Sequence, residues 1–363
     1  MALKSTANDF DRGAAKGRGA VDNREGRYEK LQVQVEDDGW YGDVGEEQGR
    51  LATTLTEESA RSIVQRNDSP DSGPDATINP YRGCEHGCIY CYARPSHSYL
   101  GLSPGLDFET RLFAKGNAVE VLRGELSRPG YRPVPVMLGA NTDAYQPVER
   151  RRRLTRGILQ VLAETRHPVH IVTKNALVER DIDLLADMAA EGLASVSLSI
   201  TTLDTDISRY MEPRASAPAR RVEAIRRLAD AGVPVGVNVA PVVPFLTDDE
   251  LETILSSAAE AGARHAAWVL LRLPWEVAPL FRDWLQERFP LKAAHVMSRM
   301  QQMRGGRDYD SDFSTRMRGT GPYAQLAARR FDRACARLGL SREFPPLDPG
   351  KFRRPSGPQL TLF

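Results

Sequence analysis

Three cysteines within eight residues constrain this chain more than any other feature. Cys84, Cys88 and Cys91 follow a C-x3-C-x2-C spacing on a loop that also contains Gly83 and Gly87. Soft thiolate ligands favour an iron–sulfur cluster or zinc over hard cations. Three thiolates can hold three corners of a cubane cluster, which leaves one iron without a protein thiolate. A cluster with an open iron is a site of reaction, whereas most four-thiolate sites carry electrons or support structure.

The residues around the cysteines resemble a known family. Residues 79–94, with the aromatic Tyr90 directly before the third cysteine, are similar to the radical S-adenosylmethionine (radical SAM) superfamily. With the later segments Asn-Thr-Asp at 141–143 and Thr-Lys at 173–174, they resemble its spore photoproduct lyase-like branch, often labelled DNA-repair photolyase-like. Many members of that branch have no assigned substrate. The resemblance covers roughly residues 76–339.

The resemblance implies two cofactors. A 4Fe-4S cluster on the three cysteines would bind the amine and carboxylate of S-adenosylmethionine at its open iron. One electron from the reduced cluster would cleave the sulfonium and give a 5′-deoxyadenosyl radical. A zinc site completed by His86 or His97 is the alternative. The cysteine spacing and the preceding Tyr90, which the resemblance places at the cofactor site, favour the cluster.

Polar residues after the predicted strands are candidate ligands for the methionyl group of S-adenosylmethionine. Asn141 and Asp143 stand where the superfamily often has a Gly-Gly-Glu segment that binds the methionyl amine, although both glycines are absent here. They still offer an amide and a carboxylate at that position. The alternative is that Asp143 caps the following turn.

Further candidates follow along the chain. Lys174 and Ser199 resemble positions that contact the methionyl carboxylate and neighbouring polar groups, and Arg214 is a second cation for that role; a solvated loop is its alternative. Asn238, a polar residue within an apolar strand, is either a ribose contact or a hydrogen-bonded core residue. The photoproduct lyases use a cysteine as hydrogen-atom donor, but the remaining Cys335 stands in a helical stretch and is expected to be a buried thiol.

Composition limits the class of protein. The chain has 363 residues, a formal net charge of +1 and 41% hydrophobic residues, which is ordinary for a soluble globular protein. No apolar run approaches the roughly 20 residues needed to span a bilayer, and no signal peptide is evident, so we expect a cytoplasmic protein with no membrane contact. Four cysteines, three of them clustered, argue against a disulfide framework and for a reducing compartment.

Short apolar runs alternate with amphipathic stretches from residue 76 onward, which indicates βα units and a parallel sheet. We therefore expect an α/β fold: a partial (β/α)6 TIM-like radical SAM barrel with the cysteine loop on the rim formed by the strand C-termini. Strands are predicted at residues 76–79, 134–139, 169–173, 195–200, 233–239 and 266–271. Helices are predicted at residues 117–126, 149–164, 177–191, 219–231, 248–261, 277–288 and 323–338.

Four regions are expected along the chain. They are a polar, largely irregular N-terminal extension (1–75), the barrel (76–290), a C-terminal helical extension (291–345) and a flexible tail (346–363). The N-terminal basic residues either contact phosphate or form a solvated arm. Residues Gln359, Leu360, Thr361, Leu362 and Phe363 resemble the peptide by which bacterial replication and repair proteins bind the polymerase sliding clamp. A tail that packs on the protein itself is the alternative.

The sequence supports three functional hypotheses. The first is a radical SAM enzyme, lyase-like or a radical transferase, that acts on damaged or modified DNA and requires an unidentified electron donor. The second is the same chemistry on RNA, a peptide or a small molecule. The third is a non-catalytic zinc-binding nucleic-acid module.

Overall fold

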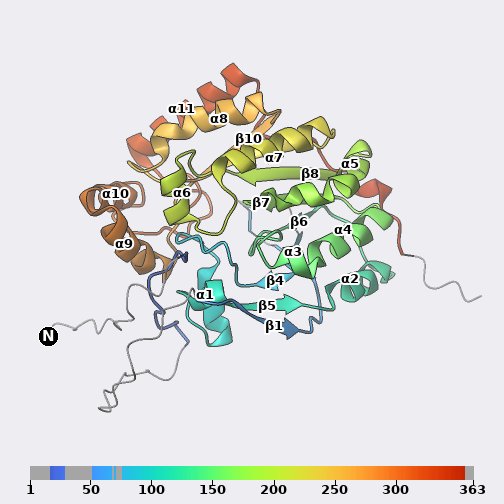
Figure 1. Ribbon diagram of the computed structural model, residues 1–363. Helices are drawn as coiled ribbons and strands as arrows, with labels where there is room; N and C mark the ends of the chain where they lie inside the picture. The colour runs from blue at the N-terminus through green and yellow to red at the C-terminus, as the bar shows by residue number, and fades with distance from the viewer. Residues whose placement is uncertain (1–16, 29–50, 68, 71–75, 356–363) are drawn as a thin grey trace, which may run out of the picture.

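Six parallel strands form the centre of the molecule. The computed structural model describes residues 17–28, 51–67, 69–70 and 76–355. Its larger sheet has the order β10-β9-β8-β7-β6-β3-β2, and all neighbours are parallel except β2 and β3 (Figure 1). Its strands are β2 (Val64–Arg66), β3 (Ala76–Ile78), β6 (Val136–Leu138), β7 (Val169–Thr173), β8 (Ala194–Ser199), β9 (Val235–Val242) and β10 (His265–Leu270).

The partial barrel expected from the sequence is confirmed. All six predicted strands are present, with ends shifted by up to a few residues, and β3, β6, β7, β8, β9 and β10 lie side by side in chain order. The sheet is not paired into a closed ring among the described residues, because β10 and β2 are its two edges. Parallel neighbours place all the strand C-termini on one rim, so the loops that follow the strands meet there.

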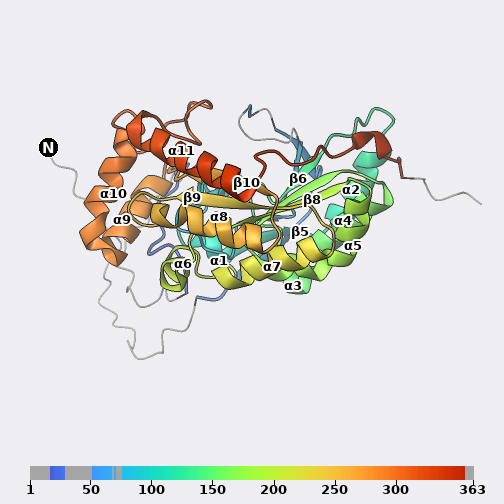
Figure 2. The same cartoon turned by 90° about the horizontal axis from the view of Figure 1, so that it is seen from above.

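Helices cover one face of this sheet, as Figure 2 shows for α4, α5, α7 and α8. The helices that follow strands β6 to β10 are α3 (Glu149–Arg152), α4 (Leu154–Glu164), α5 (Ile182–Ala190), α6 (Thr205–Met211), α7 (Pro218–Asp230), α8 (Leu251–Glu260) and α9 (Val277–Arg288). Short 3-10 turns, η2 (Ala176–Asp181) and η3 (Asp248–Glu250), precede α5 and α8. β7 alternates fully buried with half-buried residues, so its two faces meet different surroundings.

One predicted helix is wrong in detail. Residues 149–164 form two helices, α3 and α4, because Arg153 adopts a left-handed backbone conformation with φ 53°. A residue in that conformation ends the first helix and turns the chain before the second begins.

A second, smaller sheet was not predicted, and its strands come from before β3 and from between β3 and β6. It has the order β1-β5-β4, with β1 (Thr54–Glu58), β5 (Arg111–Lys115) and β4 (Tyr81–Arg82). Near it lie η1 (Arg94–Leu100), α1 (Asp107–Thr110) and α2 (Ala118–Ser127). The N-terminal extension therefore contains strands and is not irregular throughout, while the boundary at residue 75 stays a prediction.

The segment after helix α11 (Gly321–Leu338) crosses the end of the barrel opposite the rim. Helices α10 (Pro290–Gln302) and α11 are followed by the turn η4 (Pro349–Lys351). Ser341 then pairs with His265, and the amides of Asp348 and Arg353 donate to the carbonyls of Gly192 and Thr165. His265 is the first residue of β10, and Gly192 and Thr165 lie shortly before the starts of β8 and β7. The predicted clamp-binding peptide lies outside the described residues. No helix among the described residues is long and apolar enough to cross a membrane.

Candidate active site at the cysteine loop

The cysteine loop leaves the rim end of β3 through the short strand β4. Gly83 and Gly87 have φ values of 75° and 65°, which glycine adopts far more readily than other residues. A Cβ at Gly83 would lie 2.9 Å from the carbonyl oxygen of Phe108, so this position also requires a close backbone approach. The amide of Cys84 donates to that same oxygen at 2.9 Å. The loop therefore packs directly on α1.

A buried arginine fixes the shape of the loop. The Arg94 side chain is completely buried and forms an ion pair with the equally buried Glu109. Its remaining N–H groups donate to four backbone carbonyls, those of Gly87, Cys88, Pro104 and Gly105. Because a guanidinium presents five donors in a rigid plane, one side chain can hold several turns of loop in register.

Burial and backbone N–H donors have opposite effects on the cysteine thiols. Burial raises the pKa of all three thiols above their usual range, and neighbouring Asp143 and the other two thiols raise that of Cys84 further. Backbone amides oppose this rise in pKa. The amide of His86 acts on Cys84, and the amides of Ala93 and Arg94 act on Cys91. Hydrogen bonds to sulfur of this kind tune iron–sulfur clusters, and a coordinated thiol loses its proton.

The residues of the loop fit a cluster better than a zinc ion. Across the described parts of the chain, no group of three or more His, Cys, Asp or Glu side chains could hold a metal ion as it stands. A cubane holds each thiolate at a separate corner, so it does not require three sulfurs around one ion. Both ring nitrogens of His86, one candidate zinc ligand, contact Asp143 and Asn175, and the Nε2 of the other, His97, lies 3.0 Å from the Arg111 carbonyl oxygen.

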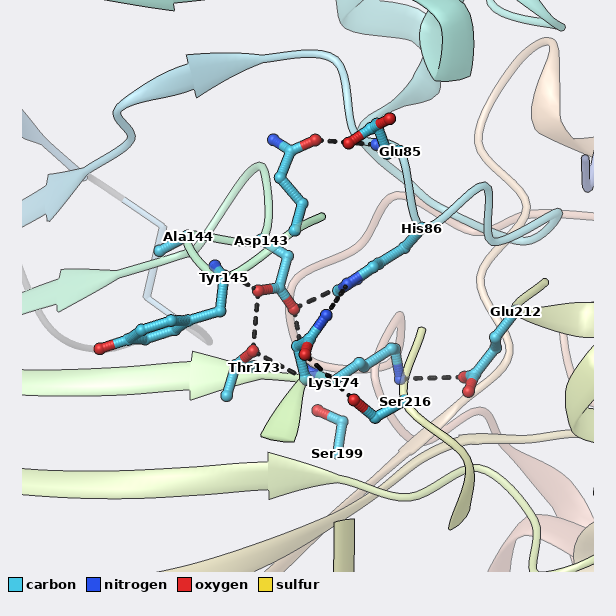
Figure 3. A network of polar contacts seen from close by, with 12 residues as sticks. Glu85, His86, Asp143, Ala144, Tyr145, Thr173, Lys174, Ser199, Glu212 and Ser216 are labelled. Carbon is cyan, nitrogen blue, oxygen red and sulfur yellow. Dashed lines mark hydrogen bonds and ion pairs between the residues drawn. The ribbon is translucent and has the colours of Figure 1, made fainter. Parts of the chain in front are cut away.

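Asp143 orders the rim between the cysteine loop and β7. Its Oδ1 accepts from the Tyr145 amide at 2.8 Å and from the Thr173 hydroxyl at 2.7 Å, and its Oδ2 accepts from the Lys174 amide at 2.8 Å (Figure 3). The Nδ1 of His86 lies 3.4 Å from Oδ2. The predicted turn cap is thus present, and both oxygens already have partners within the protein. As a ligand of the methionyl amine, Asp143 stays a prediction.

A buried carboxylate, Glu212, lies at the centre of the charged part of the site. It pairs with Arg221 and lies 3.2 Å from the Lys174 ammonium, and it accepts from the hydroxyls of Tyr90 and Thr201. Burial by itself would raise the pKa of Glu212, but Arg221 and Lys174 outweigh it and hold the pKa well below its usual range. Glu212 is therefore a permanent anion that fixes the positions of Lys174 and Tyr90.

Lys174 of the loop after β7 lies beside Tyr90 of the cysteine loop. The Lys174 ammonium is 5.6 Å from the centre of the Tyr90 ring and donates to the Ala240 carbonyl at 2.9 Å. Ser199, at the end of the neighbouring β8, is buried, and its carbonyl accepts from Arg221 at 2.9 Å. Lys174 and Ser199 are therefore at the ends of neighbouring strands, and Tyr90 of the cysteine loop lies beside Lys174.

The remaining predicted residues have different surroundings. Arg214 forms an ion pair with Glu85 in the cysteine loop at 2.9 Å, so it is not a solvated loop residue. Asn141 is exposed, and its backbone amide donates to the side-chain oxygen of Asn79 at 2.9 Å. Asn238 is half-buried in β9, opposite Ser199 of β8. Their roles toward S-adenosylmethionine stay predictions.

Sequence reasoning missed Glu212, Arg221, Arg94 and Glu109. A signal existed for Glu212, which stands two residues before the predicted Arg214 in the loop after β8. That loop is tied to the cysteine loop, because Ile89 donates to the Met211 carbonyl and the Arg214 amide donates to the His86 carbonyl. Nothing in the sequence singles out Glu109, since its partners come from distant parts of the chain.

Comparison with protein families gives one match in this region. The model of the radical SAM superfamily matches residues 78–258, which begin at the end of β3 and end within α8. The matched part contains the cysteine loop, the last residue of β3 and the whole of β6, β7, β8 and β9.

The similar proteins extend this finding. An uncharacterised protein of Mycobacterium tuberculosis is 41% identical over 216 residues, which cover 59% of this chain and 64% of that protein. The chain thus matches about 64% of the length of its mycobacterial relatives. An uncharacterised protein of Methanocaldococcus jannaschii is 27% identical over 184 residues, covering 51% of this chain and 66% of that protein.

Solved structures show the same fold. Spore photoproduct lyase complexed with dinucleoside spore photoproduct superposes with a TM-score of 0.52 at 17% identity, covering 79% of this chain and 81% of that chain. A mutant of that lyase with bound AdoMet and the dinucleoside gives a TM-score of 0.51 at 16% identity, covering 79% of this chain and 80% of that chain. At this level of identity the likeness establishes the fold alone.

Proposed function

Because residues 78–258 belong to the radical SAM superfamily, we propose that the protein is a radical SAM enzyme in which Cys84, Cys88 and Cys91 hold a 4Fe-4S cluster. The observation that carries this proposal is the three-cysteine loop itself, held on the rim of the strand C-termini by Arg94 and supplied with N–H donors to sulfur. When bound and reduced, the cluster would supply the electron that cleaves S-adenosylmethionine and yields a 5′-deoxyadenosyl radical.

The chain's own residues would bind and orient S-adenosylmethionine. Lys174 is the cation best placed for the methionyl carboxylate, since the anion Glu212 holds its ammonium beside Tyr90. Asn141 offers an amide group in the loop after β6, and Asn238 offers one within β9. Asp143 would keep the loop after β6 and the start of the loop after β7 in place. The burial of this network limits water around a reactive radical.

We propose DNA with a damaged or modified base as the substrate class. Support comes from the fold, since the similar solved structures include a spore photoproduct lyase complexed with dinucleoside spore photoproduct. The clamp-like peptide at residues 359–363 supports it independently, because clamp binding would keep the enzyme on DNA. RNA, a peptide or a small molecule is the alternative substrate. The electron donor stays unidentified, and the cytoplasmic location stays a prediction.

Anaerobic reconstitution tests the cluster and the chemistry together. We expect the purified chain to take up four irons and four sulfides, the composition of the proposed cluster, and to release 5′-deoxyadenosine from S-adenosylmethionine under a strong reductant. Cys88→Ala should abolish both properties. Cys335→Ala is the matched control, because that buried thiol lies in α11 and should be dispensable. A colourless protein that holds zinc and releases no 5′-deoxyadenosine would refute the proposal.

A second experiment tests the DNA substrate. Ultraviolet-damaged DNA, undamaged DNA and a matched RNA are added to the reconstituted protein, and the rate of 5′-deoxyadenosine formation is measured. We expect damaged DNA to increase this rate the most. An equal rate with all three and without nucleic acid would exclude DNA as the substrate.

A further inference from the structure

An N-terminal segment, residues 17–28, is built into the candidate active site. The amides of Gly19 and Ala20 donate to the Glu109 carboxylate at 2.9 and 2.8 Å, and Arg18 donates to the Glu109 carbonyl at 2.9 Å. A Cβ on Gly19 would lie 1.7 Å from the carbonyl oxygen of Gly87 in the cysteine loop. The segment is therefore seated tightly on the loop, so residues 17–28 are not a solvated arm.

The same segment continues to the far edge of the barrel. The amide of Leu106 donates to the Asp22 carbonyl at 3.1 Å. Arg24 then pairs with Asp283 of α9, and Arg27 pairs at 2.7 Å with Glu276, the residue directly before α9. Residues 17–28 thus contact both the cysteine loop and the loop after β10. These loops follow the first and the last parallel strands of the sheet.

Where the segment meets the loop after β10, aromatic rings gather on the surface. The side chains of Tyr28, Tyr99 and Trp275 are 52%, 68% and 60% exposed. Tyr28 and Tyr99 stack with ring centres 5.1 Å apart and an interplanar angle of 29°. The Arg27 guanidinium lies 4.1 Å from the Trp275 ring centre and 5.5 Å from that of Tyr28. These four residues, the stacking row, form a chain of flat groups.

The backbone of Trp275 adds an independent observation. Its φ is 47°, a conformation that is unfavourable for a bulky residue. Strain of this kind persists where the surrounding structure enforces it and is concentrated at functional sites. Burial of the indole does not compensate for this strain, because most of the ring faces solvent. A tryptophan held strained and exposed on the rim therefore points to a ligand.

We propose that Arg27, Tyr28, Tyr99 and Trp275 form a stacking surface for an unpaired base of the nucleic-acid substrate. This inference rests on the proposed function and assigns residues to its substrate. Flat aromatic and guanidinium groups bind bases through their faces, irrespective of sequence. Glu276 neutralises Arg27, so the row offers ring faces rather than the net positive charge that would bind a phosphate backbone.

The position of the row suits a base outside a duplex. β10 and β3 are both parallel strands of the sheet, so the loop of Trp275 and the cysteine loop lie on one rim. The two loops also meet directly, since the Arg272 guanidinium lies 5.2 Å from the ring centre of Tyr92, the residue after Cys91. An enzyme that acts on a base must take it out of the stack, and an exposed aromatic surface beside the site stabilises the unpaired state.

Fluorescence quenching tests the row in the full chain. A single-stranded oligonucleotide that stacks on the exposed Trp275 should quench the part of the emission that Trp275→Phe removes, because Trp268 and Trp284 are buried. The fourth tryptophan, Trp40, lies outside the described residues, and Trp40→Phe measures its share of the quenching. Trp275→Ala and Tyr99→Ala should each weaken oligonucleotide binding about tenfold, the size of effect typical for loss of a base–aromatic stack. Tyr210→Ala, which removes another exposed tyrosine outside the row, should bind like the wild type.

Several outcomes decide the inference. Unchanged affinity in Trp275→Ala, or an equal loss in Tyr210→Ala, would overturn it, as would tighter binding of a duplex than of the matched single strand. The same dependence on Trp275 with RNA would also support the surface, because stacking uses the face of the base, which both nucleic acids have. 5′-Deoxyadenosine release without nucleic acid is measured in the same preparations. If the proposed function is wrong, the wild type will release none, whatever the quenching experiment shows. Circular dichroism confirms that each variant is folded.

Discussion

At the scale of single residues, the charged network around Glu212 determines the geometry of the candidate site. A carboxylate removed from water is unfavourable unless positive and hydrogen-bonding groups surround it. Glu212 has both, with Arg221 and Lys174 as cations and two hydroxyl donors. Lys174 and Tyr90 are thereby held in position before any substrate binds. The carboxylate acts through these residues and is a positioning residue rather than a catalytic one.

Replacement of the Glu212 carboxylate should destabilise the folded protein. We expect Glu212→Gln to lower the free energy of unfolding by about 3–5 kcal/mol, because Arg221 would remain buried without a charged partner. Denaturant unfolding of the apo protein measures this. The control is Glu223→Gln, which removes a carboxylate from exposed pairs with Arg226 and Arg227 on α7 and should change stability by about 0.5 kcal/mol or less. Similar losses in both variants would contradict the role of the buried network.

His167 should make stability depend on pH. Burial lowers its pKa from 6.5 to about 4, although a hydrogen bond with the Pro168 carbonyl opposes the change. Between these values the unfolded chain binds a proton that the folded chain does not, so stability rises with pH from about 4 to 6.5 and is lost as pH falls. Because a tenfold change in a protonation equilibrium corresponds to about 1.4 kcal/mol, we expect roughly 2 kcal/mol less stability at pH 5 than at pH 7 from this residue.

Unfolding of the wild type and His167→Gln at both pH values measures this contribution. Glutamine cannot titrate but can still bond to the Tyr131 hydroxyl, which lies 2.8 Å from the His167 ring. His170, whose pKa burial also lowers to about 4, acts in the same direction and remains in the variant. The variant should therefore keep part of the pH dependence. If the difference in unfolding free energy between pH 5 and pH 7 is the same in the variant and the wild type, the assignment to His167 is contradicted.

At the scale of elements, the close fit between β9 and the C-terminal segment gives a sharp test. A Cβ at Gly236 would lie 2.6 Å from the Phe344 ring and 2.8 Å from the carbonyl oxygen of His265 in β10. We expect Gly236→Ala to destabilise the fold by about 1–3 kcal/mol through overpacking. Gly124→Ala, in α2 with nothing within 4 Å of an added Cβ, should stabilise slightly or have no effect. Thermal unfolding of both variants measures the difference, and a neutral Gly236→Ala would show that Phe344 is not held in place.

The elements that the sequence predicts are those with a periodic apolar pattern. The six parallel strands and most helices show this pattern, and so their order and the rim position of the cysteine loop are predictable. β4 is only two residues long and β1 is largely exposed, so the smaller sheet leaves no pattern. The arginines around Arg153 are good helix formers, and nothing in the sequence indicates its left-handed conformation.

The candidate site is predictable to a similar extent. Cys84, Lys174 and Tyr90 could be predicted because a motif or a strand end marks them. Glu109 could not, because its partners Gly19 and Arg94 come from segments that only the folded chain brings together. Side-chain pairing across the fold has no local signal in one sequence.

At the scale of the whole molecule, the cysteine loop and the last described residues lie at opposite ends of the barrel. The cysteine loop is on the rim of strand C-termini, and the segment that leads to the clamp-like peptide is anchored near the strand N-termini through Ser341, Asp348 and Arg353. A partner bound to residues 359–363 should therefore leave the rim open. We expect deletion of those five residues to abolish affinity for the sliding clamp and to leave 5′-deoxyadenosine release on free oligonucleotides unchanged.

Surface plasmon resonance on immobilised clamp and a turnover assay measure these two quantities on the same protein. Leu360→Ala with Phe363→Ala is the matched full-length control and should behave like the deletion. Retained clamp affinity in both variants would show that the peptide is not the binding element. Loss of turnover on free oligonucleotides would show that the tail contributes to the active site.

The anchored C-terminal segment also determines how the molecule can be handled. Lys351 and Arg354 donate to the carbonyls of Glu191 and Pro129, so the chain is fixed to the barrel up to the last few described residues. A biotin attached beyond this point would hold every molecule on a sensor by the same end, with the cysteine loop facing the flow. An attachment at the N-terminal side would instead pull on residues 17–28, whose seating against Gly87 leaves no free space.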